Sequence, residues 1–308
     1  MVVHSEQLTT REELLFCAAL LAGLGPQASS ITKELCLAAS DSLSTGRTCI
    51  DAGSTLMFSL ISPGRRSLRI LSRSSDTGID QNISRWLRMH YCAGQSPQRW
   101  IIEAFSGEKV EAWQHALNLA QMIGRETVLR RYHAALGPLG RIFNISYELE
   151  KETPCGWVTW QLDRHISPSQ ALVACGIEEV WPTVVQCLQR LFGRAFSQEV
   201  GPWSIAWTLD ENNPRVRVGT SMWVRILEDT AKRSRLLDTV EHLGGDRPFA
   251  EALYKLLESA HPTEYTTRIG RAVEVEFSAN EVLAMEFYLS VPFTIVQPSM
   301  EEKTKGNI

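Results

Sequence analysis

Pairs of alternating apolar and polar runs, each pair joined by a short polar turn, recur along this chain of 308 residues. The first pair is GSTLMFSLISPGRRSLRILSRS, residues 53–74, in which a Pro-Gly turn separates the two runs. Leu56, Phe58 and Leu60 share one face of the first run, and the arginines of the second run lie on its polar face. This period-two alternation predicts an antiparallel β-hairpin with one apolar and one polar face.

Three later stretches have the same pattern in the same sense, with helical periodicity between them. These predicted hairpins cover residues 141–164, 203–226 and 271–291. The predicted helices cover residues 11–24, 29–42, 79–91, 108–132, 168–175, 177–192, 228–243 and 248–259. Helix pairs therefore alternate with strand pairs, a long repeat that is typical of a closed or stacked architecture. A further, degenerate hairpin at residues 98–108 is left open.

The composition is that of an ordinary globular protein. A formal net charge of −4 gives no general attraction to nucleic acid or to an anionic membrane. The apolar run near the start follows Glu12 and Glu13, lacks the basic flank of a signal peptide and is too short to cross a bilayer. Seven scattered cysteines form no CxxC pair and are read as free thiols. We expect a cytoplasmic protein with one domain over residues 1–296 and a disordered tail over residues 297–308.

The polar faces of the hairpins raise the main question. They carry arginine, glutamate and aromatic residues without lysine, and guanidinium groups suit partly desolvated anion-binding surfaces. In an open sheet backed by helices, these faces meet solvent or dock a protein. In a closed antiparallel barrel with helices outside, they line a lumen wide enough for a small ligand if the barrel has about eight to ten strands. Both α+β architectures fit the pattern, and the closed barrel is preferred.

The arrangement resembles the soluble aromatic prenyltransferases of the ABBA (αββα) barrel fold. The resemblance rests on residues 53–74, WSIAWTLDENNPRVRV at 203–218 and RAVEVEFSANEVLAMEFYLSV at 271–291, and it covers most of the chain. It implies a ten-stranded antiparallel barrel ringed by helices. It also implies transfer of a prenyl group from a prenyl diphosphate to an electron-rich aromatic acceptor, as in secondary metabolism. The second of the five hairpins that the family carries is not evident here.

The resemblance assigns roles to residues of the polar faces. Diphosphate would be bound by arginines, namely Arg69, Arg73, Arg215, Arg217 and Arg225. Aromatic walls would shield the allylic cation by cation–π attraction, namely Trp157, Trp223 and Tyr288. A carboxylate would orient or deprotonate the acceptor, with Glu274, Glu276 and Glu148 as candidates.

No metal or cofactor is expected. Some family members carry an Asp for Mg²⁺ on the first hairpin, where this chain has Arg69, Leu71 and Arg73. The sequence contains no P-loop, HExxH motif, GxSxG elbow or nucleic-acid-binding stripe. The expected partners are a prenyl diphosphate and a small aromatic molecule, without nucleic acid or membrane. The alternative function is a non-catalytic ligand-binding or protein-assembly module that uses the polar sheet face.

Overall fold

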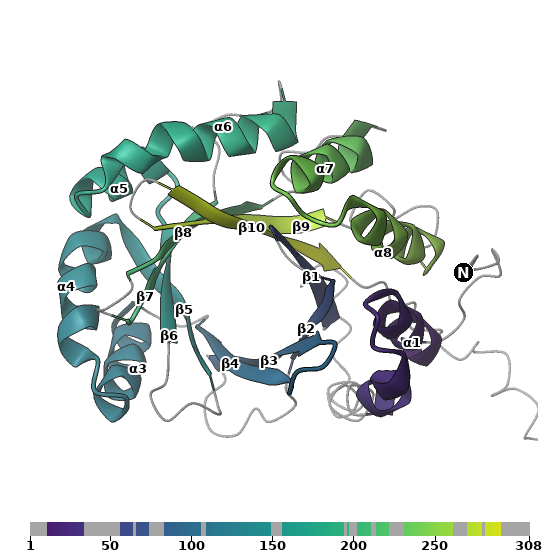
Figure 1. Ribbon diagram of the computed structural model, residues 1–308. Coiled ribbons are helices and arrows are strands. Elements are labelled where there is room, and N and C mark those ends of the chain that lie inside the picture. Colours follow the sequence, from purple (N-terminus) through teal and green to yellow (C-terminus); the bar gives the residue numbers. More distant parts are fainter. Residues whose placement is uncertain are drawn as a thin grey trace, which may run out of the picture.

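Ten antiparallel strands close into a single barrel in the computed structural model, with helices packed around its outside (Figure 1). The structure describes residues 11–33, 56–63, 66–73, 83–105, 109–148, 156–193, 196, 202–210, 214–221, 231–260, 270–278 and 281–290. Each strand pairs with its neighbours in the sequence, and β1 pairs with β10 to complete the ring. The preferred barrel is therefore confirmed, and the open sheet with a solvent-facing polar side is wrong.

The strands come in five hairpins. Their bounds are β1 Leu56–Ser62, β2 Ser67–Arg73, β3 Ile83–Cys92, β4 Gln98–Phe105, β5 Gly140–Glu148, β6 Gly156–Leu162, β7 Trp203–Thr208, β8 Val216–Ser221, β9 Gly270–Ser278 and β10 Glu281–Ser290. Because the barrel is antiparallel, the turns that close these hairpins all lie at one end of it. The four predicted hairpins thus correspond to β1–β2, β5–β6, β7–β8 and β9–β10.

Helix pairs connect β4 to β5, β6 to β7 and β8 to β9 at the opposite end, and α1 precedes β1. Their bounds are α1 Arg11–Leu21, α3 Lys109–Met122, α4 Glu126–Leu136, α5 Pro168–Ala174, α6 Trp181–Phe192, α7 Ala231–His242 and α8 Arg247–Ala260. Residues 28–33 are also helical, and the rest of the predicted helix 29–42 lies outside the described residues. Asp246 accepts a hydrogen bond from the backbone N–H of Phe249 and so begins α8.

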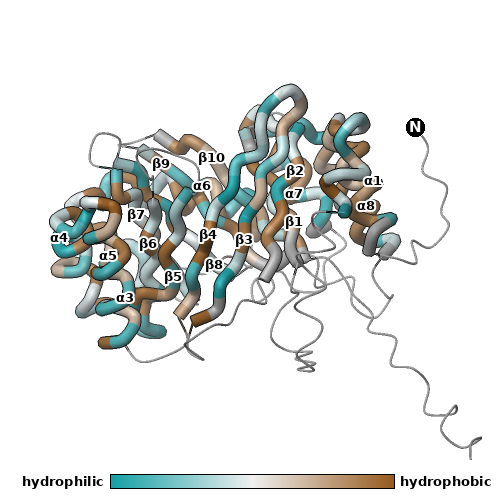
Figure 2. Tube along the Cα trace, turned by 90° about the horizontal axis from the view of Figure 1, so that it is seen from below, coloured by the Kyte–Doolittle hydropathy of each residue, from teal (hydrophilic) through white to brown (hydrophobic). Residues whose placement is uncertain are grey.

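The hydrophobic core lies between barrel and helices, not inside the barrel. Several strands each contribute fully buried residues to this core, namely Phe58, Val158, Trp160, Val218 and Val275. Hydrophilic and hydrophobic residues alternate along the strands (Figure 2), so the side chains between these core residues point into the lumen. The outward apolar residues pack against the helices, and the inward polar residues line the lumen and can form a site.

One predicted element is wrong. Residues 83–91 of the helix expected over 79–91 belong instead to strand β3, which pairs with β4 to form the hairpin that the sequence left open, and residues 79–82 lie outside the described residues. The run Trp86 to Cys92 alternates in period two, with Leu87, Met89 and Tyr91 on the outer face. Arg88 and His90, two positions apart, share the inner face of the strand, whereas in a helix they would lie on opposite sides.

Smaller differences concern the helices. The single helix expected over 108–132 is two helices, α3 and α4, separated at Gly124 with φ of +67°. The predicted tail over 297–308 and the last residues of the third predicted hairpin lie outside the described residues. The predicted free thiols are found at Cys17, Cys92, Cys175 and Cys187.

Close backbone packing at Gly140 gives a test of the closed barrel. A Cβ atom there would lie 2.3 Å from the carbonyl oxygen of Gln161 on the paired strand β6. Gly140→Ala must therefore move backbone, and we expect a loss of about 1–3 kcal/mol in the free energy of unfolding. The control is Gly25→Ala, whose Cβ would meet only Leu20 at 3.8 Å. Urea unfolding of both variants measures the difference, and equal stabilities would contradict the tight β5–β6 pairing.

Candidate active site

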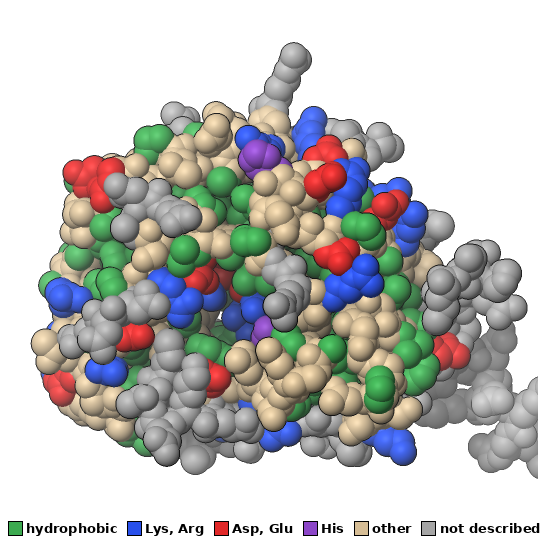
Figure 3. Space-filling model, viewed as in Figure 1, with side chains coloured by type: hydrophobic (Ala, Val, Ile, Leu, Met, Phe, Trp, Pro, Cys, Tyr) green, Lys and Arg blue, Asp and Glu red, His purple; other side chains and the backbone are tan. Residues whose placement is uncertain are grey.

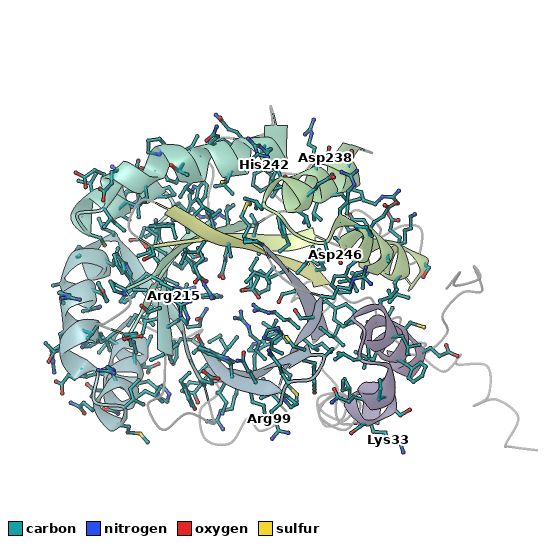
Figure 4. All side chains as sticks on the ribbon, in the orientation of Figure 1. Lys33, Arg99, Arg215, Asp238, His242 and Asp246 are labelled. Atoms are coloured by element: carbon teal, nitrogen blue, oxygen red, sulfur yellow. The ribbon has the colours of Figure 1, made fainter. Side chains whose placement is uncertain are left out.

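Polar side chains from several strands converge on the centre of the barrel. Looking along the barrel axis, basic and acidic side chains gather around a central hollow (Figure 3). Figure 4 shows Arg215 inside the ring and Arg99, an outward residue of β4, outside it. We call this lumen the chamber. Its central cluster consists of Ser59, Arg69, Arg88, Arg217, Glu274, Glu276, Glu286 and Tyr288.

Strand pairing explains why residues so distant in the sequence meet. Arg217 on β8 lies opposite Glu276 on β9, and Glu274 on β9 lies opposite Glu286 on β10. Tyr288 on β10 lies opposite Ser59 on β1, which pairs with Arg69 on β2. Lateral neighbours in a barrel share a face, so each of these pairs points inward.

Glu286 is the most enclosed carboxylate of the chamber, with a side chain only 4% exposed. It accepts a hydrogen bond of 2.6 Å from Ser59 and lies 3.6 Å from Arg69, 3.8 Å from Arg88 and 3.9 Å from Arg217. Burial would raise its pKa, but the three guanidinium groups and the Ser59 hydrogen bond outweigh burial and hold the pKa far below its usual range. Glu286 is therefore the permanent anion around which the arginines are arranged.

Glu274 behaves in the opposite way although it lies directly across from Glu286. Burial raises its pKa, and the charge of Glu286 adds to this rise, while Arg217 and Arg88 oppose it. It accepts a 2.9 Å hydrogen bond from the Tyr288 hydroxyl, which in turn accepts one of 2.7 Å from Arg88. Burial also raises the pKa of Tyr288 well above its usual value, so Tyr288 remains a proton donor. Glu274 is the carboxylate in the cluster best placed to take up a proton.

Glu276 is held by two arginines. Arg215 donates to one of its oxygens at 2.9 Å, and Arg217 donates to the other at 2.8 Å. The guanidinium carbon of Arg217 also lies 3.9 Å from the ring centroid of Trp157. Trp157 thus supports Arg217, and Arg217 is already committed to neighbours inside the protein.

Arg69 and Arg88 each have a guanidinium N–H donor that makes no hydrogen bond within the described residues. The Nε atoms of both, like that of Arg215, are buried and have no hydrogen-bond partner among the described residues, but Arg215 already donates to Glu276 at 2.9 Å through another nitrogen. In the described part of the chain, the ion pair of Arg69 is a long one, 3.6 Å to Glu286. Buried guanidinium groups with unused N–H donors are suited to a ligand with several anionic oxygens.

The structure brings together most of the predicted site residues that it describes. Arg69, Arg215, Arg217, Glu274, Glu276, Trp157 and Tyr288 all point into the chamber. Glu148 is buried and also faces inward, opposite Trp100. Arg73 lies at the end of β2 opposite Trp86, and its side chain is outside the described part. Arg225 and Trp223 lie outside the described residues.

Two inward residues, Arg88 and His90, are not among the predicted site residues because their segment is predicted to be a helix. Both come from β3, and Arg88 contacts Glu286 and Tyr288. Glu286 is not among the predicted site residues either, since nothing in its local sequence distinguishes it from Glu274 or Glu276. Counting alternate positions from Trp86 to Cys92 is the signal that finds the β3 residues.

The raised pKa of Glu274 predicts a pH-dependent effect on stability. A buried carboxyl whose folded pKa is raised favours folding below its unfolded pKa, and that contribution is lost as the pH rises through the folded pKa. Glu274→Gln stays neutral, so the free energy of unfolding of the wild type should fall relative to that of the variant as the pH rises above about 4.5. Urea unfolding at a series of pH values measures this difference. A difference that grows in favour of the wild type with pH would contradict the assignment.

The described residues contain neither a metal-binding group nor a membrane-spanning helix. No group of three or more His, Cys, Asp or Glu side chains there is placed to hold a metal ion. Within the same residues, no helix is both long enough and apolar enough to cross a membrane.

Comparisons with known proteins agree with the barrel. No protein-family model matches the chain, and no curated protein matches it by sequence. The fold is similar to that of 6-dimethylallyltryptophan synthase from Micromonospora olivasterospora, solved in complex with DMASPP and Trp, with a TM-score of 0.68 at 12% identity over 91% of this chain and 96% of that one.

Two further structures match equally well. The 5-dimethylallyltryptophan synthase from Streptomyces coelicolor gives a TM-score of 0.69 at 13% identity, over 91% of this chain and 96% of that one. AnaPT from Neosartorya fischeri gives 0.65 at 12% identity, over 94% of this chain and 95% of that one. The chain therefore has the ABBA barrel fold along nearly its whole length.

Proposed function

We propose that this protein transfers a prenyl group from a prenyl diphosphate to an electron-rich aromatic acceptor inside the chamber. The observation that carries the proposal is the position of Arg69 and Arg88, which lie at inward positions of a closed ABBA barrel and whose buried Nε atoms have no hydrogen-bond partner among the described residues. Similar folds have been solved with DMASPP and Trp bound. Fold alone does not determine function, so the argument rests on the chemistry of the chamber.

Arg69 and Arg88 are proposed to bind the diphosphate. Ionisation of an allylic diphosphate develops negative charge on the leaving oxygens, and preorganised donors stabilise that charge most in a water-poor site. Arg215 and Arg217 are turned toward Glu276 and act as supporting cations. Arg73 and Arg225 stay candidates for the same role.

Tyr288 and Glu274 are proposed to act on the allylic cation and on the aromatic acceptor. The Tyr288 ring lies 5.8 Å from the Arg88 guanidinium carbon, so the ring is next to the proposed diphosphate position and can shield the allylic cation. Glu274 accepts the proton that the aromatic ring loses after attack, because its raised pKa makes it the better base when the prenyl group has been transferred. Trp157 and Trp223 are the further proposed aromatic residues, and Glu276 and Glu148 are the alternative carboxylates.

The reaction is proposed to need no divalent metal. Arg69 occupies the part of the first hairpin where some family members carry an Asp for Mg²⁺, and its guanidinium supplies positive charge to the same region. The rate of prenyl transfer should therefore be the same with and without EDTA, measured as diphosphate released. A rate that disappears with EDTA and returns with Mg²⁺ would contradict metal independence while leaving prenyl transfer in place.

Product formation tests the proposed function. The protein is incubated with dimethylallyl, geranyl or farnesyl diphosphate and a panel of indoles and phenols, including tryptophan. Liquid chromatography with mass spectrometry detects the prenylated aromatic product, and a coupled assay measures the released diphosphate. We expect product in at least one combination. Binding of a prenyl diphosphate by calorimetry without any turnover would favour the non-catalytic ligand-binding module, and the absence of both binding and turnover would overturn prenyl transfer.

A further inference from the structure

A thiol, an imidazole and an amide form a chain of contacts at the rim of the barrel, on the hairpin β3–β4. The Cys92 sulfur lies 3.1 Å from Nε2 of His90, and Nδ1 of His90 lies 3.2 Å from the amide oxygen of Gln98. With the ring proton on Nδ1, His90 donates to Gln98 and leaves the Nε2 lone pair to accept the thiol proton. This is the order of groups that activates a nucleophile: a thiol, its base and a residue that orients the base.

The strand geometry makes this arrangement a property of the fold. His90 and Cys92 are two positions apart on β3 and share its inner face. Gln98 lies directly opposite His90 on β4. A tight turn with Gly94 at φ of +75° joins the two strands immediately after Cys92. The three side chains are therefore held in place by one short hairpin, beside Arg69 of the central cluster.

The location lets small molecules reach the thiol. Cys92 is half-buried, and residues 93–96 beside it are exposed, as is Gln98. Cys92 ends β3 on the side of the hairpin turns, so it lies at that mouth of the chamber. An electrophile can thus approach from solvent or from the lumen.

The charges around His90 keep its ring neutral and favour an anionic leaving group. Burial and the neighbouring charge of Arg69 lower the pKa of His90 to about 4, with Arg88 adding to this effect and Gln98 and Glu286 opposing it. The neutral ring keeps the Nε2 lone pair free over the physiological pH range, and because its low pKa makes it a weak base, it takes the thiol proton only as the sulfur–carbon bond forms. Arg69, opposite His90 on β2, places a positive charge where a departing anion would be stabilised.

We propose that Cys92, His90 and Gln98 form a second, nucleophilic site at the mouth of the chamber, which takes soft carbon electrophiles that carry an anionic leaving group. In the reaction, a bond forms between sulfur and carbon as the bond from carbon to the leaving group breaks. The leaving group keeps the electron pair of the broken bond, and the thiol proton moves to Nε2 of His90 and from there to water. The product is a thioether on Cys92. This site is independent of whether the chamber transfers prenyl groups.

Alkylation by iodoacetamide tests the proposal on the full chain. In this reaction iodide is the leaving anion. The rate of labelling at each cysteine is followed by peptide mass spectrometry at pH 6 and pH 8. We expect His90→Ala to slow labelling of Cys92 at pH 6 by about tenfold or more, and Gln98→Ala to slow it by less. Cys17 on α1, outside the barrel, serves as the internal control whose rate is unchanged in both variants.

The result that overturns the proposal is a Cys92 labelling rate that is the same in the wild type and in His90→Ala. Circular dichroism establishes that each variant is folded. If His90→Ala does not fold, His90→Gln replaces it, because this side chain keeps the polarity at the position but is not a base. An equal rate at Cys92 in the wild type and in that variant overturns the proposal in the same way.

Discussion

Replacing Arg69 with alanine is expected to lower kcat/KM for the prenyl diphosphate by about 100-fold or more, the usual cost of removing one donor from developing negative charge. Arg69 is the clearest choice because its unused Nε is buried and its ion pair with Glu286 is long, at 3.6 Å. The Arg69 side chain therefore has more hydrogen-bond donors available for a ligand than the side chain of Arg217, which is bound to Glu276 and packed on Trp157. Steady-state kinetics of product formation measure the effect.

A matched control separates this effect from a general loss of positive charge. Arg130 on α4 is an exposed arginine whose ion pair with Glu126 lies on the surface, and Arg130→Ala should leave kcat/KM unchanged. Arg69→Lys keeps the charge but loses the planar fork, so we expect an activity between those of wild type and Arg69→Ala. Equal kcat/KM values for wild type and Arg69→Ala would show that Arg69 does not bind the diphosphate.

Glu286→Gln is expected to destabilise the fold by about 3–5 kcal/mol, because it leaves several buried cations without their shared anion. Glu286 has a side chain only 4% exposed and lies within 4 Å of Arg69, Arg88 and Arg217. No other carboxylate of the cluster contacts all three among the described residues. Urea unfolding at pH 7 measures the loss, and Glu251→Gln, at an exposed pair with Lys255 on α8, is the control with little change.

The effect of Glu286→Gln should depend on pH with a definite sign. A carboxyl whose folded pKa is lowered adds stability above its unfolded pKa, and this is lost as the pH falls toward the folded pKa. The difference between wild type and variant is therefore full at pH 7 and shrinks below about pH 4.5. A difference that is constant over this range would show that Glu286 does not interact with the arginines as a charge.

The sequence was sufficient to predict the hairpins because the alternation is local. In four of the five hairpins each strand shows its apolar face in period two, so Phe58 and Val275 could be placed on the core side of the sheet and Arg217 and Glu274 on its polar side without any structure. The closure between β1 and β10 joins residues more than two hundred positions apart, and no local pattern encodes that pairing. The resemblance to a barrel family supplied this step.

The roles of individual charges could not be predicted for a physical reason. Glu274 and Glu286 have similar local sequences, yet their pKa values shift in opposite directions. The difference arises because Arg88, Arg69 and Arg217 outweigh burial at Glu286, whereas at Glu274 burial, with the charge of Glu286 adding to it, outweighs the opposing arginines and Tyr288. Such contacts depend on barrel closure and on the register of β3, the strand that lies where the sequence predicts a helix. A site formed by residues from five hairpins can be recognised only when the positions of all five hairpins in the barrel are known.

A crystal structure with dimethylallyl thiolodiphosphate, an analogue that ionises slowly, tests the central claim most directly. The account predicts that the diphosphate oxygens lie in the chamber, within hydrogen-bonding distance of Arg69 and Arg88, with the allylic group toward Tyr288. A chamber that stays empty at saturating analogue, or an analogue bound on the outer surface of the barrel, would contradict it.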